Sequence, residues 1–328
     1  MSNKNIIFTI GNINYNVINK LGEGAIGKVY LVKDGNNNIV VIKVAKEDNN
    51  DQLISEVNIM LKYFKKYGIA HAFRPLNYGY IQDYKKYAAI YQYFGKYNLE
   101  DIKEHRKLSL NNIKSIIKQL LIQMKGYHPL IHSDLKAANV VINDDMDVMI
   151  IDFGLSQISY NAESVISTNY ISSPESLINN LANYNKHDYY GLFSIIIQLI
   201  TKEGLWPILY GYLSDYIKYD KKYLMKDSAR VLFAYNWYRF FYTNTEEIEN
   251  KYLKQLIKVI EKGNTNLQSR SFLSYDDFMD NYIFPEIDVE SSDNLDYFLL
   301  KDFMKGIVHF DYNKRMDIND LLNHSFLK

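Results

Sequence analysis

Residues 131–154 read IHSDLKAANVVINDDMDVMIIDFG and bring polar side chains together around short apolar runs. Asp134, Lys136 and Asn139 lie within six positions, and Asp152 follows an apolar run of the kind that forms a buried strand. Carboxylate and carboxamide oxygens are the ligands that Mg²⁺ prefers, which suits Asn139 and Asp152. Phosphoryl transfer also needs a carboxylate that accepts a hydroxyl proton and a cation that offsets developing charge. Asp134 and Lys136 fit these two roles, so the stretch predicts phosphoryl transfer.

The composition describes a globular chain with enough residues for a large core. Of its 328 residues, 47% are hydrophobic and 23% are charged, which excludes a disordered chain. Basic and acidic residues number 38 each, so the net charge gives no reason to expect nucleic acid or an anionic membrane as partner. Cysteine is absent, which excludes disulfides and thiolate metal sites and favours an intracellular, cytoplasmic protein.

We expect neither a signal peptide nor membrane insertion. The first residues, MSNKNIIFTIGN, turn polar too soon for a signal peptide, and no apolar run approaches the length that spans a bilayer. Lys, Asn, Ile and Tyr are abundant, which is typical of an AT-rich coding sequence and fits a virus or a parasite. In that case the host cytoplasm is the expected location.

A glycine-rich turn is expected near the N-terminus. Gly22, Gly24 and Gly27 match G-x-G-x-x-G, a pattern that also opens dinucleotide-binding folds. A dinucleotide site needs a helix next, whereas residues 28–32 are rich in β-branched and aromatic side chains and predict a strand. We therefore expect a strand–turn–strand flap whose glycines let backbone N–H groups approach phosphate oxygens. A single strand over residues 6–20 is predicted before it.

A buried ion pair is predicted beyond the flap. Lys43 lies in the apolar run 39–44, where an unpaired ammonium is costly to bury. Residues 51–66 have helical apolar spacing and carry one glutamate, Glu56. A solvent-facing lysine and a surface glutamate are the simpler alternatives for each residue alone, and the ion pair between them is what the family resemblance given next implies.

Taken together, these motifs resemble those of the protein kinase family. Residues 131–154 are similar to its catalytic loop and metal-binding D-F-G motif, and Gly22 to Lys43 is similar to its glycine-rich loop and the phosphate-binding lysine that follows it. The resemblance implies an α+β, bilobal protein-kinase-like fold. Residues 1–94 would form a small antiparallel-sheet N-lobe with one helix, and residues 95–328 a larger, mainly helical C-lobe.

The resemblance also implies an activity. It points to a eukaryotic-type protein serine/threonine kinase that uses ATP with Mg²⁺, or Mn²⁺, to phosphorylate hydroxyl groups of protein substrates. The serine/threonine preference is implied by Lys136, which lies two residues after Asp134.

Individual site residues are assigned by the same resemblance. The catalytic residues that it implies are Asp134, Lys136, Lys43 and Glu56, and the metal ligands are Asn139 and Asp152. The nucleotide-binding residues that it implies are Leu21, Gly22, Gly24, Gly27, Val29, Lys43, Tyr91, Gln92 and Tyr93. Among these, Tyr91 is expected to guard the rear of the adenine pocket, and Gln92 to Phe94 to form the hinge.

One departure from the family concerns regulation. Ser133 stands where the family usually has an arginine, which in those members binds a phosphorylated residue of the activation loop. We therefore expect an activity that does not depend on phosphorylation of that loop. The candidate positions are Ser159, Ser164 and Thr168.

The C-terminal half carries further family features. Asp188 resembles a buried aspartate that tethers the catalytic loop, and Glu175, in a segment similar to A-P-E, is expected to form a buried bidentate pair with Arg315. Residues 203–290 are longer than the corresponding part of the family, and we expect them to include a charged helix over residues 245–262 followed by a polar run over 263–271. We expect this helical insertion to cover the lobe, with its aromatic side chains in the core; a docking surface for a partner is the alternative.

Two other functions stay open. A pseudokinase that binds nucleotide as a scaffold needs no general base, so the presence of Asp134 argues against it. A small-molecule kinase of related fold does not need the Glu175–Arg315 pair, which braces a platform for protein substrates.

Overall fold

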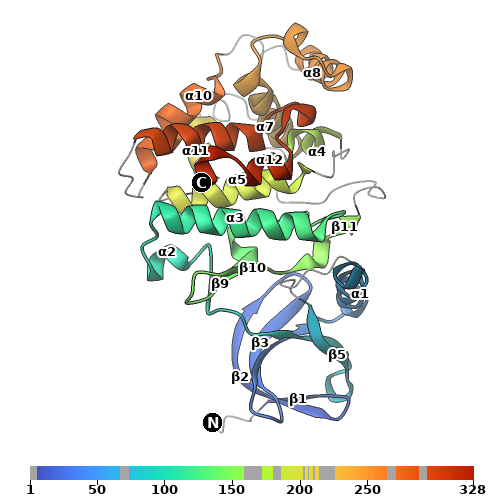
Figure 1. The fold of residues 1–328 in the computed structure, drawn as a ribbon. Helices are drawn as coiled ribbons and strands as arrows, with labels where there is room; N and C mark the ends of the chain where they lie inside the picture. Colours follow the sequence, from blue (N-terminus) through green and yellow to red (C-terminus); the bar gives the residue numbers. More distant parts are fainter. Residues whose placement is uncertain are drawn as a thin grey trace.

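The computed structural model of the chain describes residues 6–66, 74–158, 172–179, 186–201, 204–205, 207–209, 211–213, 226–263, 271–287 and 294–328. An antiparallel sheet with one helix forms its N-terminal part, and helices dominate its C-terminal part (Figure 1). This arrangement confirms the predicted α+β, bilobal architecture. None of the helices within the described ranges is long and apolar enough to cross a membrane.

Six strands form the N-terminal sheet in the order β1-β2-β3-β4-β6-β5, and each neighbouring pair is antiparallel. They are β1 (Ile7–Ile10), β2 (Ile13–Glu23), β3 (Gly27–Lys33), β4 (Ile39–Ala45), β5 (Pro75–Ile81) and β6 (Lys86–Gln92). The sheet curls until its outer strands β1 and β5 meet. Their contact is close: a Cβ added to Gly79 of β5 would lie 2.9 Å from Ile10 Cγ2 of β1. The enclosed side holds an apolar core of Phe8, Ile10, Tyr15, Val32, Val40, Ile42, Val44, Ile81, Ala88 and Ile90.

The prediction of a single strand over residues 6–20 is wrong, because the chain reverses at Gly11. Gly11 has φ +60°, a conformation that glycine adopts without a Cβ clash. The strands on either side pair with each other, and Ile10 lies opposite Ile13. Gly11 and Asn12 are typical turn residues, and they separate β1 from β2.

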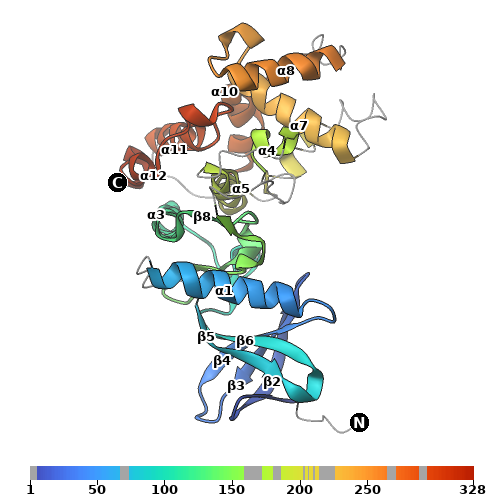
Figure 2. The ribbon, with the colours of Figure 1, turned by 90° about the vertical axis from the view of Figure 1, so that its right-hand side faces the viewer.

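Helix α1 (Asn50–Lys66) lies between the curled sheet and the helical part (Figure 2). Leu53, Val57 and Met60 recur at helical spacing and are completely buried in the main core. The buried stripe fixes the rotation of the helix about its axis, so Glu56 also faces inward.

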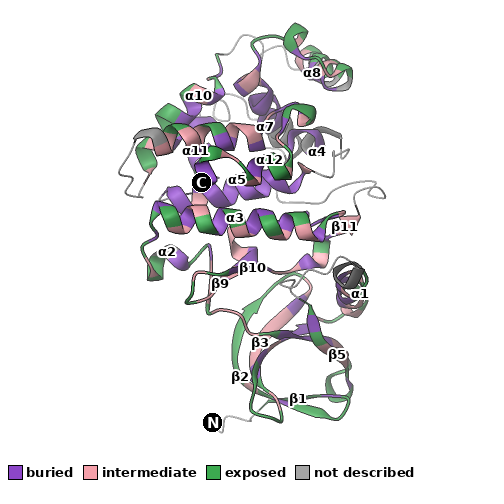
Figure 3. Cartoon of the chain, viewed as in Figure 1, coloured by how far each residue is buried: buried purple, intermediate pink, exposed green. Residues whose placement is uncertain are grey.

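The C-terminal part is organised around two long helices, α3 and α5. Its helices are α2 (Ile102–His105), α3 (Leu110–Tyr127), α4 (Pro174–Asn179), α5 (Asp188–Ile200), α7 (Lys226–Phe241), α8 (Lys251–Gly263), α10 (Tyr275–Phe278), α11 (Asn294–Ile307) and α12 (Ile318–Leu322). Helix α5 is buried along nearly its whole length (Figure 3). It packs so closely under the catalytic stretch that a Cβ on Gly191 would lie 2.3 Å from the Leu135 carbonyl oxygen.

Short strands and single turns complete the two parts. The strands are β7 (Tyr97–Asn98), β8 (Leu130–Ile131), β9 (Val140–Ile142), β10 (Val148–Ile150) and β11 (Gln157–Ile158), which pair in the orders β10-β9-β7 and β11-β8. The 3-10 turns are Gln82–Tyr84, Ala137–Asn139, Phe153–Leu155, Thr245–Glu247, Phe284–Glu286, Tyr312–Lys314 and Ser325–Leu327, and Met279–Ile283 is a π-helical turn.

Aromatic side chains in the described part of the 203–290 segment are mostly core. Tyr235, Trp237, Tyr238, Phe240 and Tyr242 are buried, as predicted, and Phe241 is partly buried. A charged helix over residues 245–262 is also predicted, but α8 begins at Lys251, because residues 245–247 form a separate turn capped by Asn244. The polar run 263–271 lies mostly outside the described residues.

Candidate active site

Lys43 of β4 lies at the centre of a three-residue ion cluster. Its Nζ is 2.7 Å from Glu56 Oε2 of α1 and 2.7 Å from Asp152 Oδ1. The side chains of Lys43 and Glu56 are 11% and 0% exposed, whereas the Asp152 side chain keeps 43% of its surface exposed. The predicted Lys43–Glu56 pair is confirmed, and the structure adds Asp152 as a second carboxylate on the same ammonium group.

The pKa values of this cluster reflect one cation between two carboxylates. Burial opposes the charged form of Lys43, but Glu56 and Asp152 outweigh it and hold the pKa of Lys43 above its ordinary value. Burial also opposes the charged form of Asp152 and so raises its pKa. The attraction of Lys43 outweighs this effect and leaves the pKa of Asp152 below its ordinary value. Burial raises the pKa of Glu56 despite the attraction of Lys43. Asp152 therefore remains ionised at neutral pH, which a metal ligand requires.

A second cluster surrounds Asp134. Lys136 Nζ lies 2.7 Å from Asp134 Oδ2. Asn139 Nδ2 donates to the backbone carbonyl oxygen of Asp134 at 2.9 Å and to Oδ2 at 3.2 Å. Because the amide nitrogen of Asn139 is used inside the loop, Oδ1 is the atom that this side chain can offer to a cation. Thus Asp134, Lys136 and Asn139 lie together, as the sequence predicts.

His132 connects the two clusters through the backbone. Its Nε2 lies 2.9 Å from the carbonyl oxygen of Ile151, and its Nδ1 accepts the backbone N–H of Asp134 at 3.3 Å. These contacts assign the proton to Nε2, which donates to Ile151. The backbone N–H of Ile151 in turn donates to the Asn139 carbonyl oxygen at 2.9 Å. The histidine is buried and holds the backbone of both clusters in place.

Asp188, at the start of α5, fixes the loop from below. Its carboxylate accepts the backbone N–H groups of His132 at 2.8 Å and Ser133 at 3.0 Å, and the hydroxyl of Tyr127 at 2.9 Å. The predicted tether is therefore confirmed, and Tyr127 is a partner that the sequence analysis missed. Ser133 has φ +69°, and Asp152 has φ +64°, so both sides of the site contain left-handed residues. Such strain persists because the surrounding hydrogen bonds hold it in place.

The glycine flap is closed over this region. The predicted strand–turn–strand is confirmed as β2, the turn and β3, and a Cβ on Gly27 would lie 2.7 Å from the Val44 carbonyl oxygen. Ile26, at the tip of the flap, reaches Gly154 after Phe153, where an added Cβ would lie 2.5 Å from Ile26 Cδ1. The same Cβ would lie 3.2 Å from Glu56 Oε2, so the tip is adjacent to the ion cluster.

The remaining nucleotide-binding candidates lie on strands β2, β3 and β6 or directly after β6. Val29 lies between Gly22 of β2 and Lys43 of β4 in the sheet register. Tyr91 is buried near the end of β6, Gln92 is exposed and Tyr93 is half-buried. Leu21 is 46% exposed.

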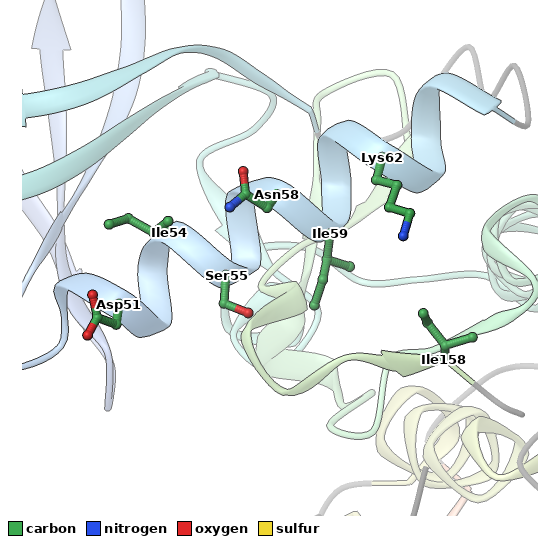
Figure 4. A pocket seen from close by; sticks show the side chains of 7 residues that line it. All are labelled: Asp51, Ile54, Ser55, Asn58, Ile59, Lys62 and Ile158. Carbon is green, nitrogen blue, oxygen red and sulfur yellow. The ribbon is translucent and has the colours of Figure 1, made fainter. Parts of the chain in front are cut away.

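A hollow on the other face of α1 does not belong to this site. It is lined by Asp51, Ile54, Ser55, Asn58, Ile59, Lys62 and Ile158 (Figure 4). Glu56 is buried on the inner face of the same helix. The hollow lies along a different face of α1, opposite Ile158 of β11. The three loop positions Ser159, Ser164 and Thr168, which follow β11, lie outside the described residues.

A family model for the protein kinase domain matches residues 15–327. This chain belongs to the eukaryotic-type protein kinase family. Its kinase domain contains the expected antiparallel sheet and helical part, and the site described above lies between them.

The curated relatives of this kinase domain carry protein kinase names. A probable serine/threonine-protein kinase, glkA of Dictyostelium discoideum, is 29% identical over 202 residues, which cover 59% of this chain and 41% of that protein. Cyclin-dependent kinase-like 1 of Caenorhabditis elegans is 28% identical over 207 residues, covering 59% and 56%. Mitogen-activated protein kinase pmk-3 of the same species is 28% identical over 227 residues, covering 62% and 48%. The chain spans about half the length of these relatives.

The donor set of this kinase domain fits the nucleotide and divalent metal that the family generally uses. Asp152 offers a partly exposed, ionised carboxylate, and Asn139 offers a carboxamide oxygen, so both are hard oxygen ligands. Gly22 and Gly24 have no described heavy atom within 4 Å of an added Cβ, so open space lies beside both glycines. That space leaves room for phosphate groups next to the flap.

Proposed function

We propose that this chain is an active protein serine/threonine kinase that transfers the γ-phosphate of ATP to protein hydroxyl groups. The observation that carries the proposal is the convergence of two complete clusters, Lys43–Glu56–Asp152 and Asp134–Lys136–Asn139. Their backbones are joined through His132 and Ile151, so the two clusters form one unit.

Each residue in this proposal has a defined task. Asp134 takes the proton of the acceptor hydroxyl, and Lys136, already 2.7 Å from it, neutralises charge beside it. Lys43, held by Glu56, orients the nucleotide phosphates, while Asn139 and Asp152 hold the metal. The bound Mg²⁺ supplies charge neutralisation on the phosphate oxygens. Leu21, Val29 and Tyr91 to Tyr93 would contact the base, with the boundary between the lobes near residue 94.

The serine/threonine preference has two supports. Lys136 lies two residues after Asp134, a pattern similar to that of serine/threonine-directed kinases, and its ion pair with Asp134 supports a role beside the acceptor hydroxyl. Of the relatives named above, glkA of Dictyostelium discoideum is a probable serine/threonine-protein kinase by name. Phosphoamino-acid analysis of a phosphorylated generic substrate tests this preference directly, and phosphotyrosine as the main product would contradict it.

Replacing the general base tests the activity itself. Asp134→Ala should lower kcat by about 10²–10⁴-fold, the usual contribution of a general base, while ATP binding persists. Asp145→Ala, at an exposed aspartate in the β9–β10 turn, is the matched control and should transfer phosphate normally. Near-normal turnover in Asp134→Ala would remove this residue as the base. Nucleotide binding without transfer in the unmodified chain would instead favour a scaffold.

A further inference from the structure

The tip of the flap is attached to the start of α1. Asn49 Nδ2 donates to the Ala25 carbonyl oxygen at 3.1 Å, and the backbone N–H of Lys46 donates to the Ile26 carbonyl oxygen at 2.9 Å. Lys46 Nζ also lies 2.9 Å from Glu23 Oε1. The contacts of Ala25 and Ile26 with Lys46 and Asn49 are called the flap contact below.

Local geometry explains why Asn49 reaches the flap. The connection between β4 and α1 is a tight turn in which Asn49 N–H donates to the Lys46 carbonyl oxygen at 3.2 Å. Asp48 has φ +66°, a conformation that short polar residues tolerate better than other side chains. Asn49 then precedes the first residue of α1, and its backbone carbonyl accepts the N–H of Leu53 at 3.2 Å.

The other end of the flap contact reaches the ion cluster. Ile26 packs against Gly154, beside both carboxylates that hold Lys43. The flap, α1 with Glu56, and the turn with Asp152 therefore form a closed circuit of contacts. In this circuit, the side chain of Asn49 and the backbone N–H of Lys46 join the flap tip to the turn before α1.

We propose that Asn49 is a positioning residue that holds the flap closed over bound nucleotide, with Ile26 as the apolar seal at the ion cluster. This inference rests on the proposed function, because a closed flap matters only if nucleotide binds beneath it. The hydrogen bond of Asn49 is the main candidate rather than the Lys46–Glu23 ion pair. Glu23 and Lys46 are 36% and 33% exposed, and ion pairs that accessible are screened by solvent.

Two substitutions separate a flap role from a helix-capping role. Asn49→Ala removes both the donor and the polar side chain before α1. Asn49→Asp keeps a residue that is as good as asparagine at a helix N-terminus, but a carboxylate cannot donate to the Ala25 carbonyl oxygen. Asn19→Asp, on β2, introduces the same charge at an exposed asparagine and is the matched control.

The experiment measures ATP affinity by titration calorimetry and amide hydrogen exchange of residues 24–27 without nucleotide. Both Asn49 variants should weaken ATP binding by about 3–10-fold, the effect of losing one net hydrogen bond, and should exchange faster in the flap. Turnover at saturating ATP should stay within about twofold of the unmodified chain, because Asn49 touches no reacting atom. Asn19→Asp should match the unmodified chain.

Adding Ile26→Ala tests the coupling. If Asn49 and Ile26 act through the same flap position, the double variant should lose less affinity than the product of the single effects. Unchanged affinity and exchange in both Asn49 variants would overturn the inference, as would a defect in Asn49→Ala that Asn49→Asp lacks. Failure of the unmodified chain to bind ATP would overturn the proposed function instead, and the exchange measurement would still decide the flap contact.

Discussion

Two buried cations of this chain, Arg315 and Lys43, are satisfied in different ways. Arg315 makes a bidentate pair with Glu175, with both N–H···O distances at 2.7 Å, and donates from Nε to the His309 carbonyl oxygen at 2.8 Å. The side chains of this pair are 0% and 1% exposed, which confirms the predicted buried pair. Lys43 instead faces two carboxylates, one of which, Asp152, remains substantially exposed.

The difference separates a structural ion pair from a candidate functional one. Arg315 and Glu175 balance each other in a closed geometry, with the Tyr190 ring 4.9 Å from the guanidinium. Lys43 leaves one negative charge in excess in its cluster, and the excess lies on the accessible carboxylate. A cation from solution can balance the Lys43 cluster, whereas the Arg315–Glu175 pair is already balanced and has no place for one.

Breaking the structural pair should have the largest effect. Arg315→Met leaves Glu175 as an uncompensated buried charge, so the free energy of unfolding should fall by about 3–5 kcal/mol. Denaturant titration measures this. Arg106→Met, at the 39% exposed partner of Asp144, is the control and should cost less than about 1 kcal/mol. Arg315→Met with Glu175→Leu should regain much of the loss; no recovery in the double variant would mean that the pair is not the cause.

Breaking the functional pair should affect transfer more than folding. Lys43→Met should lower kcat/KM by about 10²–10³-fold, the usual cost of one charge-stabilising donor. The free energy of unfolding should fall by less than in Arg315→Met, since the raised pKa of Glu56 lets that carboxyl take up a proton. Lys33→Met, at the exposed end of β3, is the control for activity. Equal stability losses in Lys43→Met and Arg315→Met would contradict the comparison.

Acid should destabilise the surroundings of Arg315 before it affects Lys43. Burial lowers the pKa of His309 to about 4, against an ordinary value of 6.5. A depressed histidine pKa means that the unfolded chain binds more protons between these values, so stability is full above 6.5 and falls as the pH drops toward 4. From about pH 7.5 to about pH 5 this should cost about 2 kcal/mol in denaturant titrations. His309→Asn should reduce the slope and leave the contribution of His187, whose pKa burial also lowers. An unchanged slope would exclude His309 as a source.

A small effect on stability is expected from replacing Ser133, the residue before Asp134. Its hydroxyl is buried without a hydrogen-bond partner within the described part of the chain, while its backbone N–H is held by Asp188. Ser133→Ala keeps the backbone contact and removes the unsatisfied hydroxyl, so thermal denaturation should show a gain of about 0–1 kcal/mol. A clear loss of stability would show that the hydroxyl has a partner.

The sequence predicts most of the site because its residues belong to short motifs whose spacing fixes their neighbours. Asp134, Lys136 and Asn139 meet within one loop, and Lys43 meets Glu56 because the apolar stripe of α1 fixes that helix against the sheet. The contacts it misses join segments that no motif relates. Asn49 reaches Ala25 only after the β4–α1 turn is formed, and Tyr127 meets Asp188 only after α3 and α5 pack.

Part of the fold escaped prediction for a local reason. Residues 6–20 have enough strand-forming side chains for one long strand, and a single glycine decides that they form two. The start of α8 was misplaced because a charged run does not distinguish a helix from a preceding turn. In both cases one capping or turn residue overrides the average tendency of the segment.

The central claim is that Lys43, Asp134, Asn139 and Asp152 serve one metal–nucleotide site. Calorimetric titration of ATP with and without Mg²⁺, on the unmodified chain and on Asp152→Asn, tests it most directly. We predict that Mg²⁺ strengthens ATP binding to the unmodified chain and that Asp152→Asn, which keeps its shape and loses its charge, abolishes this gain. Binding that ignores Mg²⁺ in both proteins, or an Asp152→Asn variant that responds to Mg²⁺ as the unmodified chain does, would contradict the claim.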